Sequence, residues 1–278
     1  MPKADTSGAI RSRSNELRVQ PSKFLSPGTA KGPLSKFKRI DFAGENELAK
    51  NVATAWLRQV EDANRVGSPF YVALSGGRIA RKFFSAAAEQ ASGAASLSPV
   101  HFFWADERCV PPHDPESNFR VAHELLLEPL KIADDRIHRI RGEESADFTV
   151  AEAEAEIRRI APLNGENQPV LDLILLGMGE DGHVASLFPS EPDSVMSSPA
   201  VYRKVTSIKP PPLRITLGYA AIAAARQVWV LASGPGKEMA LRTSLEPAGQ
   251  TPLAGVIKSR VLTRIFTDIV SGKRASKS

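Results

Sequence analysis

Short apolar runs alternate along this chain with longer stretches of helical spacing, and this alternation limits the folds that the chain can adopt. The short runs predict buried or half-buried strands at 70–74, 100–104, 171–176, 214–217, 227–232 and 261–267. The longer stretches, dominated by Ala, Leu, Glu and Arg, predict helices at 45–65, 80–90, 118–127, 147–160 and 237–245. Strands separated by helices of this length favour right-handed βαβ crossovers. We therefore expect an α/β fold with three layers, α/β/α, around a mainly parallel, Rossmann-like sheet.

The two ends of the chain differ in composition from the rest. Residues 1–39 carry nine Lys and Arg against two acids, and Lys273, Arg274 and Lys277 add further positive charge. The net charge of +5 therefore belongs to the ends, and residues 40–272 are mildly acidic. Because the first segment is rich in Pro, Gly and Ser, we expect a disordered basic tail at 1–35 and one domain at 36–270. We do not expect nucleic-acid binding, since such tails are usually only solvating segments.

The cysteine content and the apolar runs bear on the compartment. The lone Cys109 cannot form an internal disulfide, which favours a reducing compartment. No apolar run approaches the ~20 residues of a membrane-spanning helix. The first 35 residues lack the apolar centre of a secretory signal peptide, and although they faintly resemble an organelle transit peptide, disorder is the preferred interpretation. We expect a cytoplasmic protein, monomeric or weakly dimeric, without membrane contact.

Ligands of parallel sheets bind beyond the C-terminal ends of the strands, so the residues that follow predicted strands are the site candidates. Strand 70–74 runs into Ser75, Gly76, Gly77 and Arg78 ahead of a helix. Two glycines and a helix start can present N–H groups to an anion such as phosphate, and Arg78 can add donors. Taken alone, Ser-Gly-Gly is more often a plain structural turn.

A second candidate segment follows strand 100–104 and begins with Asp106, Glu107 and Arg108, ahead of a proline-braced loop. Asp106 and Arg108 can contact a ligand at the edge of the sheet, or they can form a structural ion-pair cluster, and the sequence favours neither. At the end of the loop, either Ser117 or Asn118 is expected to cap the next helix.

The strand at 171–176 opens into a loop with three glycines that delivers Asp181 and His183. A neutral imidazole titrates near physiological pH and can take a proton from water, so His183 is the candidate general base. Asp181 or another carboxylate can orient the ring and stabilise its protonated form. The alternative is a surface or capping histidine, which the position at a strand end disfavours.

Two further cations lie where a phosphate can be held. Arg214 follows three prolines at the start of a strand, and Lys237 follows Ser-Gly-Pro-Gly at a helix start, although a solvated surface role fits each equally well. The five histidines show no H-x-x-x-H or H-E-x-x-H spacing, and there is no Cys pair, so we expect no metal site. Without a G-x-S-x-G motif, a serine-hydrolase interpretation has no nucleophile.

Taken in order, five segments resemble the 6-phosphogluconolactonase family, a sister of the glucosamine-6-phosphate deaminases. They are A-L-S-G-G at 73–77, W-A-D-E-R-C-V-P-P-H-D-P-E-S-N at 104–118, D-L-I-L-L-G-M-G-E-D-G-H-V-A-S-L-F-P at 172–189, R-I-T-L at 214–217 and A-A-R-Q-V-W-V-L-A-S-G-P-G-K at 224–237. The second and third are long and specific. A-S-L-F-P after the histidine and W-A-D-E-R are similar to lactonases, whereas the deaminases carry a phenylalanine-asparagine-glutamate run and a D-E-Y motif there.

This resemblance implies an α/β/α fold and hydrolysis of 6-phospho-D-glucono-1,5-lactone to 6-phosphogluconate, in the oxidative pentose phosphate pathway and without a cofactor. It implies His183 as the general base. It also implies, as candidates for binding the substrate and its phosphate, Gly76, Gly77, Arg108, Arg214 and Lys237. In one departure, lactonases usually read S-G-G-S-T-P, whereas Arg78 follows the glycines here. Arg78 either replaces the missing hydroxyls with charge or alters the substrate preference.

Two other functions stay open at this point. In a glucosamine-6-phosphate deaminase or isomerase, Asp106 would abstract a carbon-bound proton, and ammonia release would reveal the reaction. A non-catalytic sugar-phosphate sensor on the same fold is suggested by the altered glycine loop and the basic tail. Such a sensor would bind its ligand tightly without hydrolysis, or would retain DNA until residues 1–35 are removed.

Overall fold

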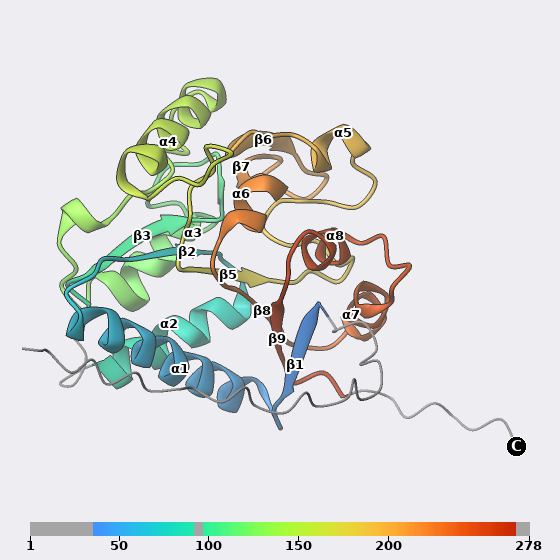
Figure 1. The fold of residues 1–278 in the computed structure, drawn as a ribbon, viewed down its shortest axis with the longest axis horizontal. Helices are drawn as coiled ribbons and strands as arrows, with labels where there is room; N and C mark the ends of the chain where they lie inside the picture. Colours follow the sequence, from blue (N-terminus) through green and yellow to red (C-terminus); the bar gives the residue numbers. More distant parts are fainter. Residues whose placement is uncertain (1–35, 92–96, 271–278) are drawn as a thin grey trace, which may run out of the picture. The chain divides into compact units, whose positions relative to one another are not determined.

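A parallel sheet of six strands forms the centre of the described chain, which in this computed structural model comprises residues 36–91 and 97–270 (Figure 1). Every neighbouring pair of its strands is parallel. In spatial order the strands are β1 (Phe37–Asp41), β9 (Thr263–Thr267), β8 (Val228–Ala232), β5 (Leu173–Gly177), β2 (Phe70–Leu74) and β3 (Val100–Trp104). The expected parallel α/β fold is thereby confirmed. The basic tail expected at 1–35 lies outside the described residues.

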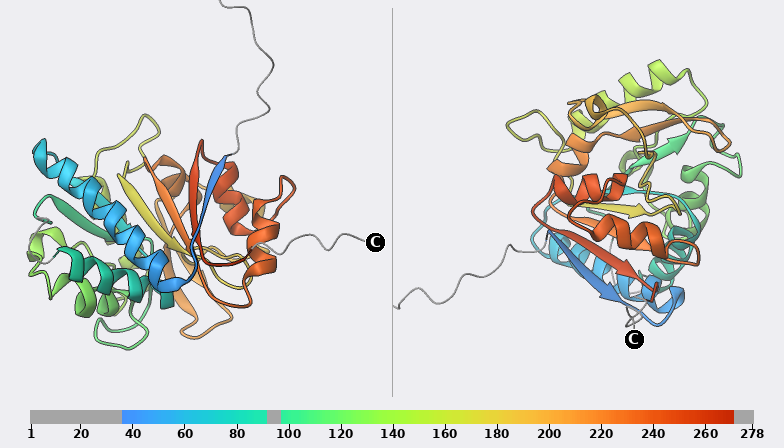
Figure 2. Two further views of the ribbon diagram at one scale, coloured as in Figure 1. Left: turned by 90° about the horizontal axis from the view of Figure 1, so that it is seen from below. Right: turned by 90° about the vertical axis from the view of Figure 1, so that its right-hand side faces the viewer.

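Helices cover both faces of this sheet (Figures 1 and 2). Along one face run α1 (Glu45–Arg65) and α2 (Arg78–Ala91), and on the other lie α6 (Tyr219–Ala224), α7 (Glu238–Leu245) and α8 (Pro252–Lys258). The shorter or outlying helical segments are α3 (Asn118–Ala122), the π-helical turn η1 (His123–Leu127), the 3-10 turn η2 (Asp134–Arg136), α4 (Ala146–Ile160) and α5 (Asp193–Met196). No helix in the described ranges is both long enough and apolar enough to cross a membrane.

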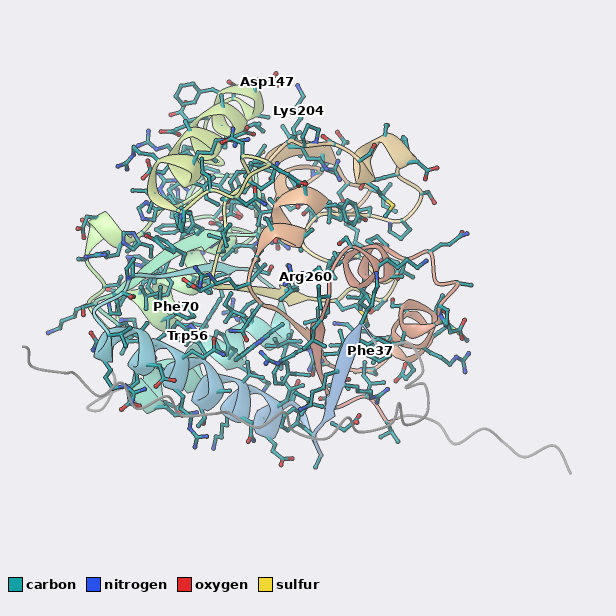
Figure 3. All side chains as sticks on the ribbon, in the orientation of Figure 1. Phe37, Trp56, Phe70, Asp147, Lys204 and Arg260 are labelled. Carbon is teal, nitrogen blue, oxygen red and sulfur yellow. The ribbon has the colours of Figure 1, made fainter. Side chains whose placement is uncertain are left out.

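Trp56 shows how the apolar periodicity of α1 builds the core. The buried residues of this helix recur at helical spacing, so one face packs inward and the other meets solvent. The Trp56 ring lies between α1 and the sheet (Figure 3), with centroid distances of 5.6 Å to Phe83 of α2 and 6.3 Å to Phe102 of β3. A single aromatic side chain therefore ties two helices to the sheet.

A second sheet, antiparallel and three-stranded, has the order β4 (Asp106–Arg108), β7 (Leu213–Leu217) and β6 (Tyr202–Thr206). The strand predicted at 214–217 belongs here and not to the parallel sheet. An ion pair of 2.5 Å between Lys204 and Asp147 joins β6 to α4 (Figure 3). Because β4 follows β3 almost directly, this small sheet carries the charged residues after Trp104 across the carboxyl end of the large sheet.

Most differences between predicted and observed elements concern short or polar segments. The predicted boundaries of α1, β2 and β3 match, and those of the other predicted strands and helices shift by one or two residues, except that the helix predicted at 118–127 divides into α3 and η1. The elements that were not foreseen are β1, β4, η2, α5, β6, α6 and α8. The strand β4 consists of Asp-Glu-Arg, and β6 mixes charged and apolar residues, so neither shows the apolar signal of a buried strand.

Candidate active site

The path of the chain through the large sheet reverses between the neighbouring strands β2 and β5. From β2 the chain crosses to the edge strand β3, whereas from β5 it proceeds through β8 and β9 towards the other edge. Loops that diverge in this way leave a crevice at the carboxyl ends of the strands. The carbonyl of Gly76 lies against Gly177 at this point, so the topology brings the loop after β2 beside the glycine loop after β5.

A cavity of about 200 Å³ opens at the crevice. Nine of the ten residues singled out from the sequence line it: Ser75, Gly76, Gly77, Arg78, Asp106, Arg108, His183, Arg214 and Lys237. The other lining residues are Ile79, Asn118, Gly177, Met178, Gly179 and Ala185. Four cationic side chains and one carboxylate face this space, which therefore suits an anionic ligand. In the described residues, His, Cys, Asp and Glu form no group of three that could hold a metal ion.

The loop after β2 offers an unpartnered hydroxyl and a helix start to the cavity. Ser75 is only 7% exposed, and its Oγ has no hydrogen-bond partner in the described part of the chain. Gly76 and Gly77 lead directly into α2, whose 14 residues give the N-terminal N–H groups a partial positive charge. Both features fit a bound phosphate or carboxylate.

His183 and Asp181 form a hydrogen-bonded pair at the edge of the cavity. The Nδ1 atom of His183 lies 2.5 Å from Oδ1 of Asp181, and the backbone N–H of His183 donates to the same oxygen at 3.1 Å. Burial alone would raise the pKa of Asp181, but the hydrogen bonds and charge of His183 outweigh burial and lower this pKa. A carboxylate at Nδ1 favours the tautomer that leaves Nε2 free to accept a proton. Asp181 itself does not line the cavity.

The packing of the glycine loop fixes the orientation of the His183 ring. The ring centroid lies 5.0 Å from that of Phe188, and on another side the ring touches Gly179 so closely that a Cβ there would overlap it. The N–H of Gly179 donates to the carbonyl of His183 at 2.9 Å, which closes the loop. The carbonyl of Gly182 accepts the N–H of Leu253 at 3.1 Å, which anchors the loop to α8.

Arg108 and Arg214 enter the cavity from the small sheet, where they are direct partners on the antiparallel strands β4 and β7. Arg214 is only 6% exposed, donates to the carbonyls of Pro211 and Lys209, and lies 5.8 Å above the ring of Phe188. Burial, and then the charge of Arg108, lowers the pKa of Arg214. The sequence left two roles open for Arg214, phosphate binding and a solvated surface position. Because Arg214 is buried and lines the cavity, the solvated surface position is excluded.

Asn118 is a cavity residue that sequence reasoning treated only as a helix cap. Its Nδ2 donates to the backbone carbonyl of Asp106 at 2.9 Å, and its side chain touches Gly76. Ser117 is the N-cap of α3, because its Oγ accepts the N–H of Arg120. The carboxylate of Asp106 accepts from Ser186 at 2.8 Å. The contacts of Asn118 with Asp106 and Gly76, and that of Asp106 with Ser186, join residues twelve or more positions apart, so no local pattern could have revealed them.

Glu107 holds the strand of cavity residues against α3. Its carboxylate accepts the backbone N–H groups of Arg108, Asn118 and Phe119 at 2.7 to 2.8 Å and the hydroxyl of Ser117 at 3.1 Å. Burial raises the pKa of this carboxyl to about 7, although the backbone hydrogen bonds oppose the shift. The sequence named Glu107 between two candidates but gave it no role.

Comparisons with known proteins show the family to which the chain belongs. The family described as glucosamine-6-phosphate isomerases/6-phosphogluconolactonase matches residues 43–265. A 6-phosphogluconolactonase of Streptomyces coelicolor is 34% identical over 241 residues, covering 83% of this chain and 92% of the relative. That of Mycobacterium tuberculosis is 37% identical over 182 residues, covering 63% and 72%. The solved structure of a 6-phosphogluconolactonase from Trypanosoma brucei is 26% identical, with a TM-score of 0.73, covering 82% of this chain and 95% of that chain. The chain therefore belongs to the glucosamine-6-phosphate isomerase/6-phosphogluconolactonase family.

Proposed function

We propose that this enzyme hydrolyses 6-phospho-D-glucono-1,5-lactone to 6-phospho-D-gluconate, with His183 as the general base. The membership of the family and the names of its relatives support the reaction. The observation that carries the assignment of the base is the His183–Asp181 pair at the rim of a cavity lined by four cations.

The phosphate lies, in this proposal, at the end of the cavity formed by the Ser75–Arg78 loop. The unpartnered Oγ of Ser75 and the N-terminal N–H groups of α2 supply donors there. Lys237, which follows the Ser233–Gly236 loop, supplies a charge, and its ammonium has no hydrogen bond or ion pair with any described residue. A phosphate dianion therefore finds donors and positive charge together.

The lactone carbonyl carbon, C1, then lies beside His183. Nε2 of His183 removes a proton from a water molecule, whose oxygen attacks C1, and Asp181 stabilises the imidazolium that forms. When the tetrahedral intermediate collapses, the bond between C1 and the ring oxygen breaks. The imidazolium returns the proton to that oxygen, which becomes the C5 hydroxyl, and the new carboxylic acid loses its own proton to solvent.

Charge on the oxygen of the tetrahedral intermediate needs a stabilising group. Arg78 and Lys237 belong to the phosphate end of the cavity in this proposal. The two remaining cations, Arg108 and Arg214, are direct partners on β4 and β7 and are the candidates for this role. A donor fixed at such a position is worth about 3 kcal/mol of transition-state stabilisation in other hydrolytic enzymes. Arg214, whose buried side chain is held by two carbonyls, is already oriented before the reaction.

Acid release from freshly generated 6-phosphogluconolactone, measured at constant pH and corrected for uncatalysed hydrolysis, tests this function. We expect the wild-type protein to accelerate the release and His183→Ala to lower kcat by roughly 100- to 10,000-fold with the fold intact. Full activity in the variant would remove His183 as the base. Ammonia release from glucosamine 6-phosphate, with no lactone hydrolysis, would instead assign the deaminase reaction.

The proposal also covers the partners of the protein and its compartment. The substrate is a small phosphosugar lactone, and no role in binding nucleic acid is assigned, because the excess of basic residues belongs to the ends of the chain. A monomer or weak dimer in the cytoplasm is the proposed state, and the single Cys109 supports the reducing compartment. Gel filtration at several concentrations of the full chain checks the oligomeric state.

A further inference from the structure

Arg78 is held by a carboxylate from another element of the fold. Its Nη1 forms an ion pair with Oε2 of Glu45, the first residue of α1. The other oxygen of Glu45 lies 3.3 Å from the ammonium of Lys82, one turn further along α2, and Lys82 also donates to Asn46 at 2.8 Å. Glu45 therefore ties the first turn of α1 to the first turns of α2 at the mouth of the cavity.

The other end of the Arg78 guanidinium lies against the loop between β8 and α7. A Cβ at Gly234 would overlap Nη2 of Arg78, so the guanidinium lies directly against this residue, and the φ of +99° is a backbone conformation that favours glycine. The N–H of Gly234 and the hydroxyl of Ser233 donate to Asp268 at 3.2 and 2.9 Å. The guanidinium is thus fixed between Glu45 and a loop that is itself fixed.

The same loop carries Lys237. The contacts of Arg78 with Glu45 and Gly234 therefore place two cations, Arg78 and Lys237, near each other at one end of the cavity. Both line the cavity, and after burial the charge of Arg78 is the next largest influence that lowers the pKa of Lys237. Two like charges repel each other unless an anion lies between them. Within the described residues Glu45 pairs with Arg78 from outside the cavity, whereas Glu180 and Asp268 act on Lys237 through their charge without forming an ion pair with it.

We propose that Glu45 is a positioning residue, which fixes Arg78 beside Lys237 so that the two cations select a dianionic phosphate over an uncharged hydroxyl at C6 of the lactone. This inference rests on the proposed function and assigns the phosphate specificity of this chain to a contact between α1 and α2. Glu45 occupies Nη1 and Gly234 lies against Nη2, so Nε of the planar guanidinium stays available as a donor for a phosphate oxygen. Without Glu45, the long side chain of Arg78 would have to be ordered by the substrate itself.

The experiment compares kcat and KM on two substrates, 6-phosphogluconolactone and unphosphorylated glucono-1,5-lactone. The variants are Glu45→Gln, Arg78→Ser and the double variant. The matched control is Asp62→Asn, which removes the same charge from the exposed ion pair with Arg65 at the far end of α1. Thermal unfolding of each variant checks that the fold is kept.

We expect Glu45→Gln and Arg78→Ser each to raise KM for the phosphorylated lactone roughly tenfold or more, the size of a lost charge-assisted hydrogen bond, with kcat little changed. KM for the unphosphorylated lactone, which lacks the group that Arg78 contacts, should rise much less than KM for the phosphorylated lactone, and the double variant should match Arg78→Ser alone, because Glu45 acts through Arg78. Asp62→Asn should behave as the wild type on both substrates.

An unchanged or lowered KM in Glu45→Gln would overturn the inference, as would equal effects on both lactones or additive effects in the double variant. Equal kcat/KM of the wild type on both lactones would overturn the assigned selectivity. Should Glu45→Gln fail to fold, Arg78→Ser decides the substrate selectivity, since its side chain is 56% exposed and supports no core. Failure of the proposed function looks different, because the wild type itself would then hydrolyse neither lactone.

Discussion

The Nδ1 atom of His183 lies 2.5 Å from Oδ1 of Asp181, so the candidate base and its orienting carboxylate belong to one loop of three glycines. The carboxylate of Asp181 contacts Nδ1, whereas Nε2 is the atom proposed to take the proton, and Asp181 does not line the cavity. We therefore expect Asp181 to act on the reaction through His183, and substitutions of the two residues test this.

We expect Asp181→Asn to lower kcat by roughly 100-fold or more, because an amide at Nδ1 removes the charge that stabilises the imidazolium and permits the wrong tautomer. The double variant Asp181→Asn with His183→Ala should be no slower than His183→Ala alone, since the two residues act as a unit. The measurement is kcat from acid release at saturating lactone. A wild-type kcat in Asp181→Asn would show that the contact is structural only.

A methyl group at residue 179 should disturb the base without touching the substrate-binding cations. A Cβ on Gly179 would overlap Cε1 and Nδ1 of His183, so Gly179→Ala must displace the ring from its place beside Asp181. We expect a fall in kcat of at least tenfold, consistent with the sensitivity of general-base catalysis to small displacements. The matched control is Gly165→Ala, at an exposed position where a Cβ meets nothing within 4 Å. Equal activity of the two variants would contradict the assigned packing.

Ser75→Ala separates ligand binding from folding. The Oγ of Ser75 is buried and has no hydrogen-bond partner in the described residues, and such a group destabilises a fold by about 1–3 kcal/mol. We therefore expect the alanine variant to be as stable as the wild type or more stable, while KM for the phosphorylated lactone rises several-fold. Urea unfolding and initial-rate kinetics measure the two effects. Loss of stability together with an unchanged KM would show that the hydroxyl serves the fold and not the ligand.

The sequence predicted most of the large sheet and nine of the fifteen residues that line the cavity for one physical reason. Buried parallel strands leave apolar runs such as 228–232, and the residues that follow those runs meet at one edge of the sheet. The rule that points to strand ends thus found the loops that hold Ser75, Asp106, His183 and Lys237 without any knowledge of their contacts.

What the sequence could not predict depends on contacts between distant segments. The antiparallel pairing that sets Arg108 opposite Arg214 joins a charged tripeptide to a strand about a hundred residues away, and neither segment signals its partner. Likewise Asn118 has the local pattern of a cap, and only the tertiary structure places it against Gly76. The ion pair of Arg78 with Glu45 and its contact with Gly234 likewise join distant segments, and no local pattern around Arg78 indicates them.

Glu107 gives the fold a dependence on pH that a single substitution can isolate. Burial raises the pKa of Glu107 from its ordinary value of 4.5 to about 7 in the folded protein. Between these two values the folded state holds a proton on this group that the unfolded state has lost, so the contribution of Glu107 to stability falls as pH rises. The contribution of Glu107 to the free energy of unfolding is complete below about pH 4.5 and is lost once the pH passes about 7.

Glutamine has no carboxyl proton to lose, so the stability of the Glu107→Gln variant should lack the pH dependence that comes from residue 107. We expect the free energy of unfolding of the wild type, measured relative to that of Glu107→Gln, to fall by about 3 kcal/mol between roughly pH 4.5 and 7.5. Urea unfolding of both proteins across this range gives the difference, in which the other titrating groups cancel. Glu116→Gln, at an exposed carboxyl in the loop between β4 and α3, should show the same pH dependence of stability as the wild type. A constant difference between wild type and Glu107→Gln would mean that the three backbone N–H groups outweigh burial and keep this carboxylate ionised throughout.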